Sequence, residues 1–79
     1  MQAAMPASAV LDEVDKAILK ALKEIGGPAK PKDIAARAGL DARRVAAKMR
    51  KLRTLGLVER LEEGLYKLTE EGEKVASES

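Results

Sequence analysis

Apolar residues recur at helical spacing in the first part of the chain. They are Leu11, Val14, Ile18, Leu22 and Ile25. Steps of three and four residues place side chains on one face of a helix, so this stretch predicts an amphipathic helix. Asp12 is placed to cap its start, because a carboxylate there can accept a backbone N–H that has no helical partner. The Gly-Gly-Pro run at residues 26–28 predicts its end.

Two further helical patterns follow, separated by a short turn. Pro31 suits the first position of a helix, and the apolar positions after it are Ile34, Ala35 and Ala38. Gly39 predicts the turn, and Asp41 is placed to cap the next helix. The apolar stripe of that third helix is Val45, Met49 and Leu52. Its end is expected near Leu55, before Gly56.

The remaining residues predict a small hairpin and a last short helix. Val58 and Leu61 precede a Glu-Gly pair at residues 63–64, and Tyr66 and Leu68 follow it. Residue 69 is a threonine that can cap a helix, although a glycine at residue 72 is expected to weaken it. The order of elements is that of a winged helix-turn-helix. The sequence therefore predicts a mainly α fold with a three-helix core, a two-stranded wing and a short C-terminal helix.

The 79 residues leave room for one small domain. We assign it to residues 11–76, between a flexible lead-in at residues 1–10 and a frayed end at residues 77–79. No stretch reaches the roughly 18 consecutive apolar residues of a membrane span, and residues 1–9 carry no Lys or Arg to begin a signal peptide. We expect a cytoplasmic protein that makes no membrane contact.

The residue types exclude most catalytic chemistry. The chain has no Cys and no His, which removes disulfides, thiolate nucleophiles, imidazole bases and the usual zinc ligands. The acidic pairs at residues 62–63 and 70–71 have no companion base, and no Walker-type glycine loop occurs. We therefore expect no enzyme activity, no metal site and no cofactor.

The net charge of +2 is unevenly distributed. Residues 41–54 carry six Lys or Arg and one acid, whereas residues 55–79 carry three Lys or Arg and seven acids. A basic patch on one helix is typical of a nucleic-acid binder. A merely solvated helix face, the competing interpretation, predicts mixed signs, but the single acid of the basic segment is Asp41 at its start.

The outward side of the third helix, opposite its apolar stripe, carries the candidate DNA-binding residues. They are Arg43, Arg44, Ala47, Arg50, Lys51 and Thr54, with Lys48 and Arg53 on the flanks. Arg43, Arg44 and Ala47 are candidates for base-edge contact, because long donors reach guanine and a small side chain allows close approach. None of these residues lies on the apolar stripe, so replacing Arg44 or Lys51 is expected to spare folding.

The other basic residues are candidates for phosphate contact. Arg50, Lys51 and Arg53 lie in the second half of the third helix. Lys30 and Lys32 flank the start of the second helix, where unpaired backbone amides can share a phosphate. The alternative for the last two is that they are ordinary surface lysines.

The predicted wing departs from the charge usual in DNA-binding wings. Its tip carries Glu62 and Glu63, which DNA would repel. Arg60 and Lys67, lower on the hairpin, are the basic groups that could bring the wing to DNA. Either the wing stays away from DNA or it faces a protein partner.

Two stretches resemble known regulator families. The segments LDEVDKAILKALKEIGG and KDIAARAGLDARRVAAKMRKLRTLGLVER resemble the DNA-binding domain of the leucine-responsive (feast/famine) regulators. The tail GLYKLTEEGEKV is similar to the wing and following helix of multiple-antibiotic-resistance-type and related archaeal winged-helix regulators. The resemblance implies a fold and double-stranded DNA as the partner, but no target sequence.

We expect a transcriptional regulator, or a transcription or chromatin component, of an archaeal or bacterial cell. The alternative is a winged-helix protein-interaction module whose acidic wing or C-terminal segment meets a partner. Single-stranded RNA is disfavoured because Tyr66 is the only aromatic residue. The sequence leaves open whether the chain forms a homodimer.

Overall fold

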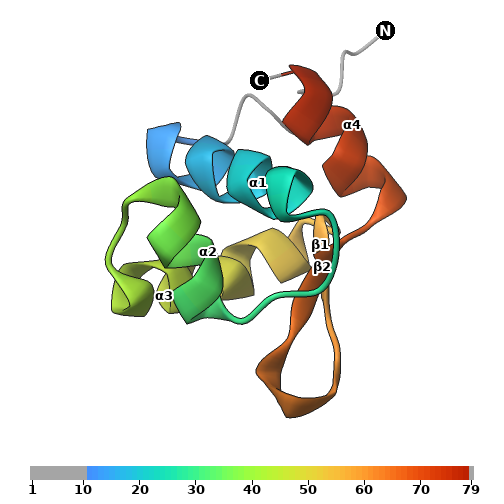
Figure 1. The fold of residues 1–79 in the computed structure, drawn as a ribbon. Helices are drawn as coiled ribbons and strands as arrows, with labels where there is room; N and C mark the ends of the chain where they lie inside the picture. Colours follow the sequence, from blue (N-terminus) through green and yellow to red (C-terminus); the bar gives the residue numbers. More distant parts are fainter. Residues whose placement is uncertain (1–10, 79) are drawn as a thin grey trace, which may run out of the picture.

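A computed structural model of the chain describes residues 11–78, and the predicted lead-in at residues 1–10 lies outside them. The described part is mainly helical, with one two-stranded antiparallel hairpin (Figure 1). Its elements are α1 (Glu13–Ile25), α2 (Pro31–Ala38), α3 (Ala42–Thr54), β1 (Val58–Arg60), the single turn η2 (Glu62–Gly64), β2 (Tyr66–Leu68) and α4 (Glu70–Glu78). The predicted winged helix-turn-helix fold is confirmed. None of the helices within residues 11–78 is both long and apolar enough to cross a membrane.

Helix α1 begins at a reciprocal cap. The backbone N–H of Asp15 donates to Asp12 Oδ1 at 2.9 Å, and the backbone N–H of Asp12 donates to Asp15 Oδ2 at 3.1 Å. This capping box satisfies two donors that the helix cannot pair internally. The predicted cap at Asp12 is confirmed, whereas the part played by Asp15 was not predicted.

The core fills the space where α1 meets the other helices. The fully buried large side chains include Ile18, Leu19 and Leu22 of α1, Ile34 of α2, Val45, Met49 and Leu52 of α3, and Leu57 before β1. The predicted stripe of α3 is therefore confirmed. Helix α1 packs against α2, α3 and α4, so its buried face is wider than one stripe.

Two positions of α1 differ from the predicted apolar face. Leu19, which was not in the predicted stripe, has no exposed surface, because α1 is covered from more than one side. Ile25 was predicted to be on the buried face but is 37% exposed. It is the last residue of α1, where the chain turns away at Gly26 in the left-handed region with φ 82°.

The turn between α2 and α3 fixes how the two helices pack. Gly39 adopts a left-handed backbone with φ 73°, which glycine permits without steric cost. The N–H of Leu40 then donates to the carbonyl of Ala35 at 2.8 Å. Asp41 caps α3, because its Oδ1 accepts the backbone N–H of Arg43 at 2.7 Å. The predicted cap and turn are thus confirmed.

The wing is a short hairpin with a tight tip. Strands β1 and β2 pair antiparallel with Val58 opposite Leu68 and Arg60 opposite Tyr66. Glu63 and Gly64 have positive φ angles of 63° and 76°, as the central residues of a type I′ turn require. The sequence did not predict a third contribution to this sheet: Ala29, between α1 and α2, forms an isolated bridge with Tyr66 through backbone hydrogen bonds of 2.8 and 2.9 Å.

Helix α4 leaves the wing and packs against α1. The Oγ1 of Thr69 accepts the N–H of Gly72 at 3.0 Å and donates to the carbonyl of Gly56 at 2.6 Å. The predicted cap is confirmed. The same hydroxyl group links the start of α4 to Gly56, which lies just after α3. Helix α4 continues to Glu78.

Candidate nucleic-acid interface

Four arginines of α3 are exposed and unpaired within residues 11–78. Arg43, Arg44, Arg50 and Arg53 are all exposed. Among the described residues none of them takes part in an ion pair. A guanidinium stays charged and offers several donors in a planar fork, which suits guanine edges and phosphates. The arginines are thus available to an external anion.

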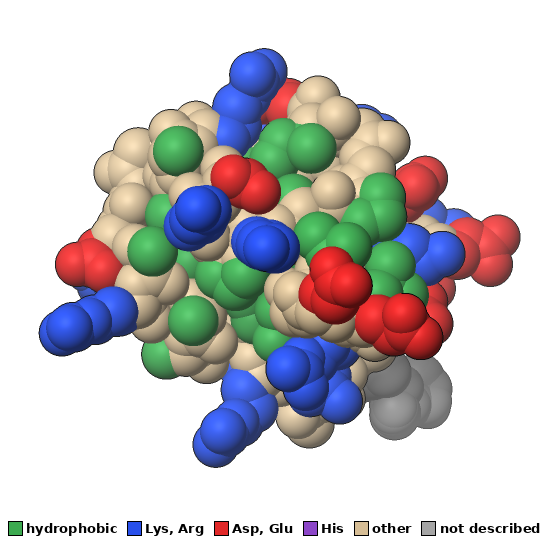
Figure 2. Space-filling view, turned by 60° about the horizontal axis from the view of Figure 1, so that its bottom comes forward, with side chains coloured by type: hydrophobic (Ala, Val, Ile, Leu, Met, Phe, Trp, Pro, Cys, Tyr) green, Lys and Arg blue, Asp and Glu red, His purple; other side chains and the backbone are tan. Residues whose placement is uncertain are grey.

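Two small side chains are exposed beside these arginines on α3. Ala47 is exposed on α3, one turn from Arg43 and close in sequence to Arg50. Thr54 is also exposed, and its hydroxyl donates to the carbonyl of Arg50 at 3.1 Å. Figure 2 shows a face of the molecule on which Lys and Arg side chains are spread among apolar side chains, with several acidic side chains toward one edge and others elsewhere on the face. A duplex groove could approach such a surface closely.

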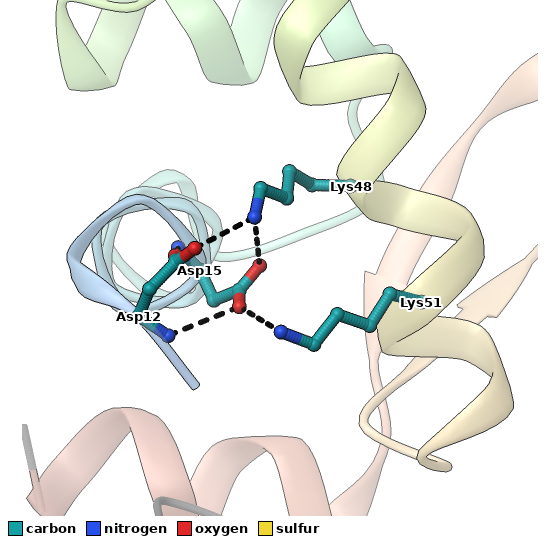
Figure 3. A network of polar contacts seen from close by, with 4 residues as sticks. All are labelled: Asp12, Asp15, Lys48 and Lys51. Atoms are coloured by element: carbon teal, nitrogen blue, oxygen red, sulfur yellow. Dashed lines mark hydrogen bonds and ion pairs between the residues drawn. The ribbon is translucent and has the colours of Figure 1, made fainter. Parts of the chain in front are cut away.

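The two lysines of α3 behave differently from the arginines. Lys51 Nζ donates to Asp15 Oδ2 at 2.6 Å, and Lys48 Nζ donates to Asp12 Oδ2 at 2.7 Å. Both lysines reach across to α1, as Figure 3 shows. Lys51 was predicted to lie on the outward face; its side chain is 39% exposed, but its ammonium group is turned toward α1. Its long stem follows the flank of α3 to a buried carboxylate, which a helical wheel of α3 alone cannot show.

Asp15 is the centre of this network. Its side chain has no exposed surface, and a buried carboxylate is costly unless paired. Oδ2 accepts from Lys51 and from the backbone of Asp12, whereas Oδ1 has no hydrogen-bond partner and lies 3.9 Å from Lys48 Nζ. No sequence signal identified Asp15, because its lysine partner lies 36 residues away.

The pairing shifts the ionisation of Asp12 and Lys48 in opposite directions. The hydrogen bond from Lys48, and then that from the backbone of Asp15, holds the pKa of Asp12 well below its usual range. The same hydrogen bond to Asp12 raises the pKa of Lys48 above its ordinary value. Both charges are therefore retained across the neutral pH range.

The lysines at the start of α2 are exposed. Lys30 is the N-cap residue of α2 but makes no side-chain capping hydrogen bond, and Pro31 follows it. Lys32 lies in the first turn. Because α2 packs against α3, these two lysines and the arginines belong to neighbouring elements.

The wing tip is acidic on the surface as well as in sequence. Glu62 and Glu63 are exposed. Lys67, one of the basic groups lower on the hairpin, faces Glu59 across the strands with an Nζ to Oε1 distance of 3.9 Å. Arg60 remains exposed.

Within residues 11–78 no group of three acidic, His or Cys side chains is placed to hold a metal ion.

Comparison with solved structures places this fold among regulators. Ligand-free NadR superposes with a TM-score of 0.76 at 31% identity, over 90% of this chain and 52% of that one. A putative transcriptional regulator from Pseudomonas aeruginosa superposes with a TM-score of 0.75 at 27% identity, over 89% and 52%. This chain therefore spans about half the length of those structures.

The same fold also occurs inside a larger enzyme. The O-methyltransferase NcsB1 superposes with a TM-score of 0.65 at 28% identity, over 91% of this chain but only 26% of the methyltransferase. The likeness covers a minor part of that enzyme. No curated protein sequence matches the chain significantly.

A family model for the AsnC-type helix-turn-helix domain matches residues 11–53. The match covers α1, α2 and nearly all of α3, which are the elements that carry the exposed arginines and the network of Figure 3. It stops before the wing, so the resemblance of the tail to multiple-antibiotic-resistance-type regulators is not confirmed. The chain belongs to the AsnC-type helix-turn-helix family.

Proposed function

We propose that the chain binds double-stranded DNA in the major groove through the exposed face of α3 and so serves in transcription regulation. The observation that carries this proposal is the set of exposed arginines on the third helix of a helix-turn-helix, none of them paired within the described residues. An α-helix fits the major groove, and arginine is the commonest side chain to read guanine there.

The proposed roles follow from position along α3. Arg43, Arg44 and Ala47, in the first half, approach base edges. Arg50 and Arg53 contact phosphates, with Thr54 beside them at the end of the helix. Lys48 and Lys51 are left out of this surface, because their ammonium groups pair with α1.

The start of α2 supplies the other phosphate contacts in this proposal. Lys30 and Lys32 are exposed and flank backbone amides at the N-terminus of α2. Helix N-termini favour anions because of these amides and the helix dipole. Together with Arg50 and Arg53 they make about four phosphate contacts, which predicts a slope of log K against log salt of roughly −3 to −4.

A protein-interaction role is the second candidate, and the acidic wing tip favours it. Glu62 and Glu63 are exposed and would be repelled by DNA, whereas a basic protein partner would attract them. In that case α3 would serve assembly rather than DNA binding. Fold likeness does not separate the two, because one fold hosts many functions.

A DNA titration separates the two candidate functions. A fluorescently labelled mixed-sequence duplex is titrated with the chain, and its anisotropy is measured across a salt series. DNA binding predicts saturable association that weakens with salt at about the slope above. The absence of association at about 50 mM salt would reject the proposed function and leave the protein-interaction role.

A further inference from the structure

We propose that Asp12 limits the non-specific DNA affinity of the chain by holding Lys48 on α1 and away from the DNA-binding face of α3. The inference rests on the proposed DNA binding and adds a residue that controls it from outside the interface. Asp12 acts as a positioning residue, since it acts through its contact with Lys48.

The contacts of Lys48 support this assignment. Its Nζ lies 2.7 Å from Asp12 Oδ2 and 3.9 Å from Asp15 Oδ1. Asp15 Oδ2 is already engaged by Lys51 at 2.6 Å. Asp12 is therefore the main partner of Lys48 (Figure 3). The Asp12 side chain is 53% exposed and the Lys48 side chain 25% exposed, so the pair lies at the protein surface, where a phosphate can compete with the Asp12 carboxylate.

Lys48 is within reach of DNA once it is released. It lies one helical turn after Arg44 on α3, so the two side chains start from neighbouring positions of the helix surface. A lysine has a flexible four-carbon stem, so its ammonium can move from α1 toward a duplex docked on the arginines.

Holding Lys48 back changes the balance between two kinds of binding. Phosphate contacts carry no sequence information, and they supply essentially all of non-specific binding. An ammonium neutralised by Asp12 adds little to that term, while the arginines remain free to read bases. The pairing therefore lowers affinity for random DNA more than it lowers base readout.

The test compares two variants that remove one acid each from the first turn of α1. Asp12→Asn removes the partner of Lys48 but keeps a side-chain oxygen to cap the helix, since Asn caps as well as Asp. Glu13→Gln removes the neighbouring exposed charge, which has no ion pair among the described residues. Lys48→Met and the double variant Asp12→Asn/Lys48→Met complete the set, with thermal melting to verify folding.

Binding to random duplex is measured for each variant across a salt series. Asp12→Asn should tighten binding roughly fivefold at ~0.1 M salt and steepen the log–log slope by about 0.9, as one added phosphate contact does. Glu13→Gln and Lys48→Met should leave the slope unchanged, and the double variant should lose the gain.

The outcomes separate this inference from the proposed function. If the wild-type chain does not bind duplex DNA, both are overturned. If it binds but Asp12→Asn and Glu13→Gln have equal slopes, only the inference is overturned. A slope that becomes shallower by about 0.9 in Lys48→Met also overturns it, because Lys48 would then already contact a phosphate in the wild-type complex.

Discussion

Lys51 of α3 and Asp15 of α1 form an ion pair of 2.6 Å in which the carboxylate has no exposed surface. Removal of the lysine would leave Asp15 buried with only the Asp12 backbone N–H and the more distant Lys48 as compensation. We expect Lys51→Met to lower the free energy of unfolding by about 1–3 kcal/mol, the usual cost of a buried polar group that loses its partner.

Urea unfolding of Lys51→Met beside Lys20→Met provides the measurement. Lys20 is exposed on α1 and has no ion pair among the described residues, so its replacement should change the free energy of unfolding by less than about 0.5 kcal/mol. Equal stability of the two variants would show that the buried pair contributes nothing.

Stability should fall in acid and stay nearly flat around neutrality. Pairing lowers the pKa of Asp12 in the folded state, so the unfolded chain takes up a proton first. The resulting stabilisation is complete above about pH 4 and is lost as the pH falls below it. With no His and no Cys, no side chain of ordinary pKa titrates between about pH 5 and 8.

Thermal melting from pH 2 to pH 8 tests this expectation. The transition temperature of the wild-type chain should decline on the acid side, and Asp12→Asn should decline less steeply. An Asp12→Asn curve parallel to that of the wild-type chain would contradict a stabilising role for the pair.

Gly72 is buried within α4, and its environment excludes a side chain. A Cβ atom there would overlap the carbonyl oxygen of Leu57 and approach Leu68 Cδ2 to 3.1 Å. Gly72→Ala should therefore destabilise the protein by about 1–3 kcal/mol, although alanine is the better helix former by roughly 1 kcal/mol. Ser77→Ala, exposed in the same helix, is the control and should be neutral or slightly stabilising in urea unfolding. A gain in stability for Gly72→Ala would mean that α4 does not pack closely on Leu57.

Glu63 holds a left-handed backbone conformation, with φ 63° and ψ 25°. Such a conformation costs a non-glycine residue roughly 1–2 kcal/mol, and asparagine tolerates it better. Glu63→Asn should raise the free energy of unfolding by about 0.5–1 kcal/mol. Glu62→Asn makes the same charge change at the preceding residue of the turn and should be near neutral. A larger gain for Glu62→Asn than for Glu63→Asn would rule out backbone strain as the cause.

Local signals in the sequence were sufficient for most of the fold. Asp12, Asp41 and Thr69 cap helices as predicted, because a cap depends on residues within three positions of it. The α3 stripe was also predictable, since one helix face repeats every few residues. The bridge of Ala29 to Tyr66 was not, because it joins residues 37 positions apart that carry no pairing signal.

The candidate site was predictable only in part, for the same reason. The helical period correctly placed the four arginines of α3 on exposed positions. The helical period did not predict the direction of the Lys51 side chain. Its ammonium group reaches Asp15 of α1, and the period of α3 carries no information about the position of α1. The buried position of Asp15 likewise depends on how α1 packs on α3, which is a tertiary relationship.

The most direct test of DNA binding by α3 compares two double variants that each remove two positive charges. Arg50→Ala/Arg53→Ala acts on the proposed interface, and Lys20→Ala/Lys74→Ala acts on exposed positions of α1 and α4. Anisotropy with one random duplex across a salt series should give a slope shallower by about 1.8 for the arginine variant and little change for the lysine variant. Equal slopes in the two variants would contradict the proposed interface.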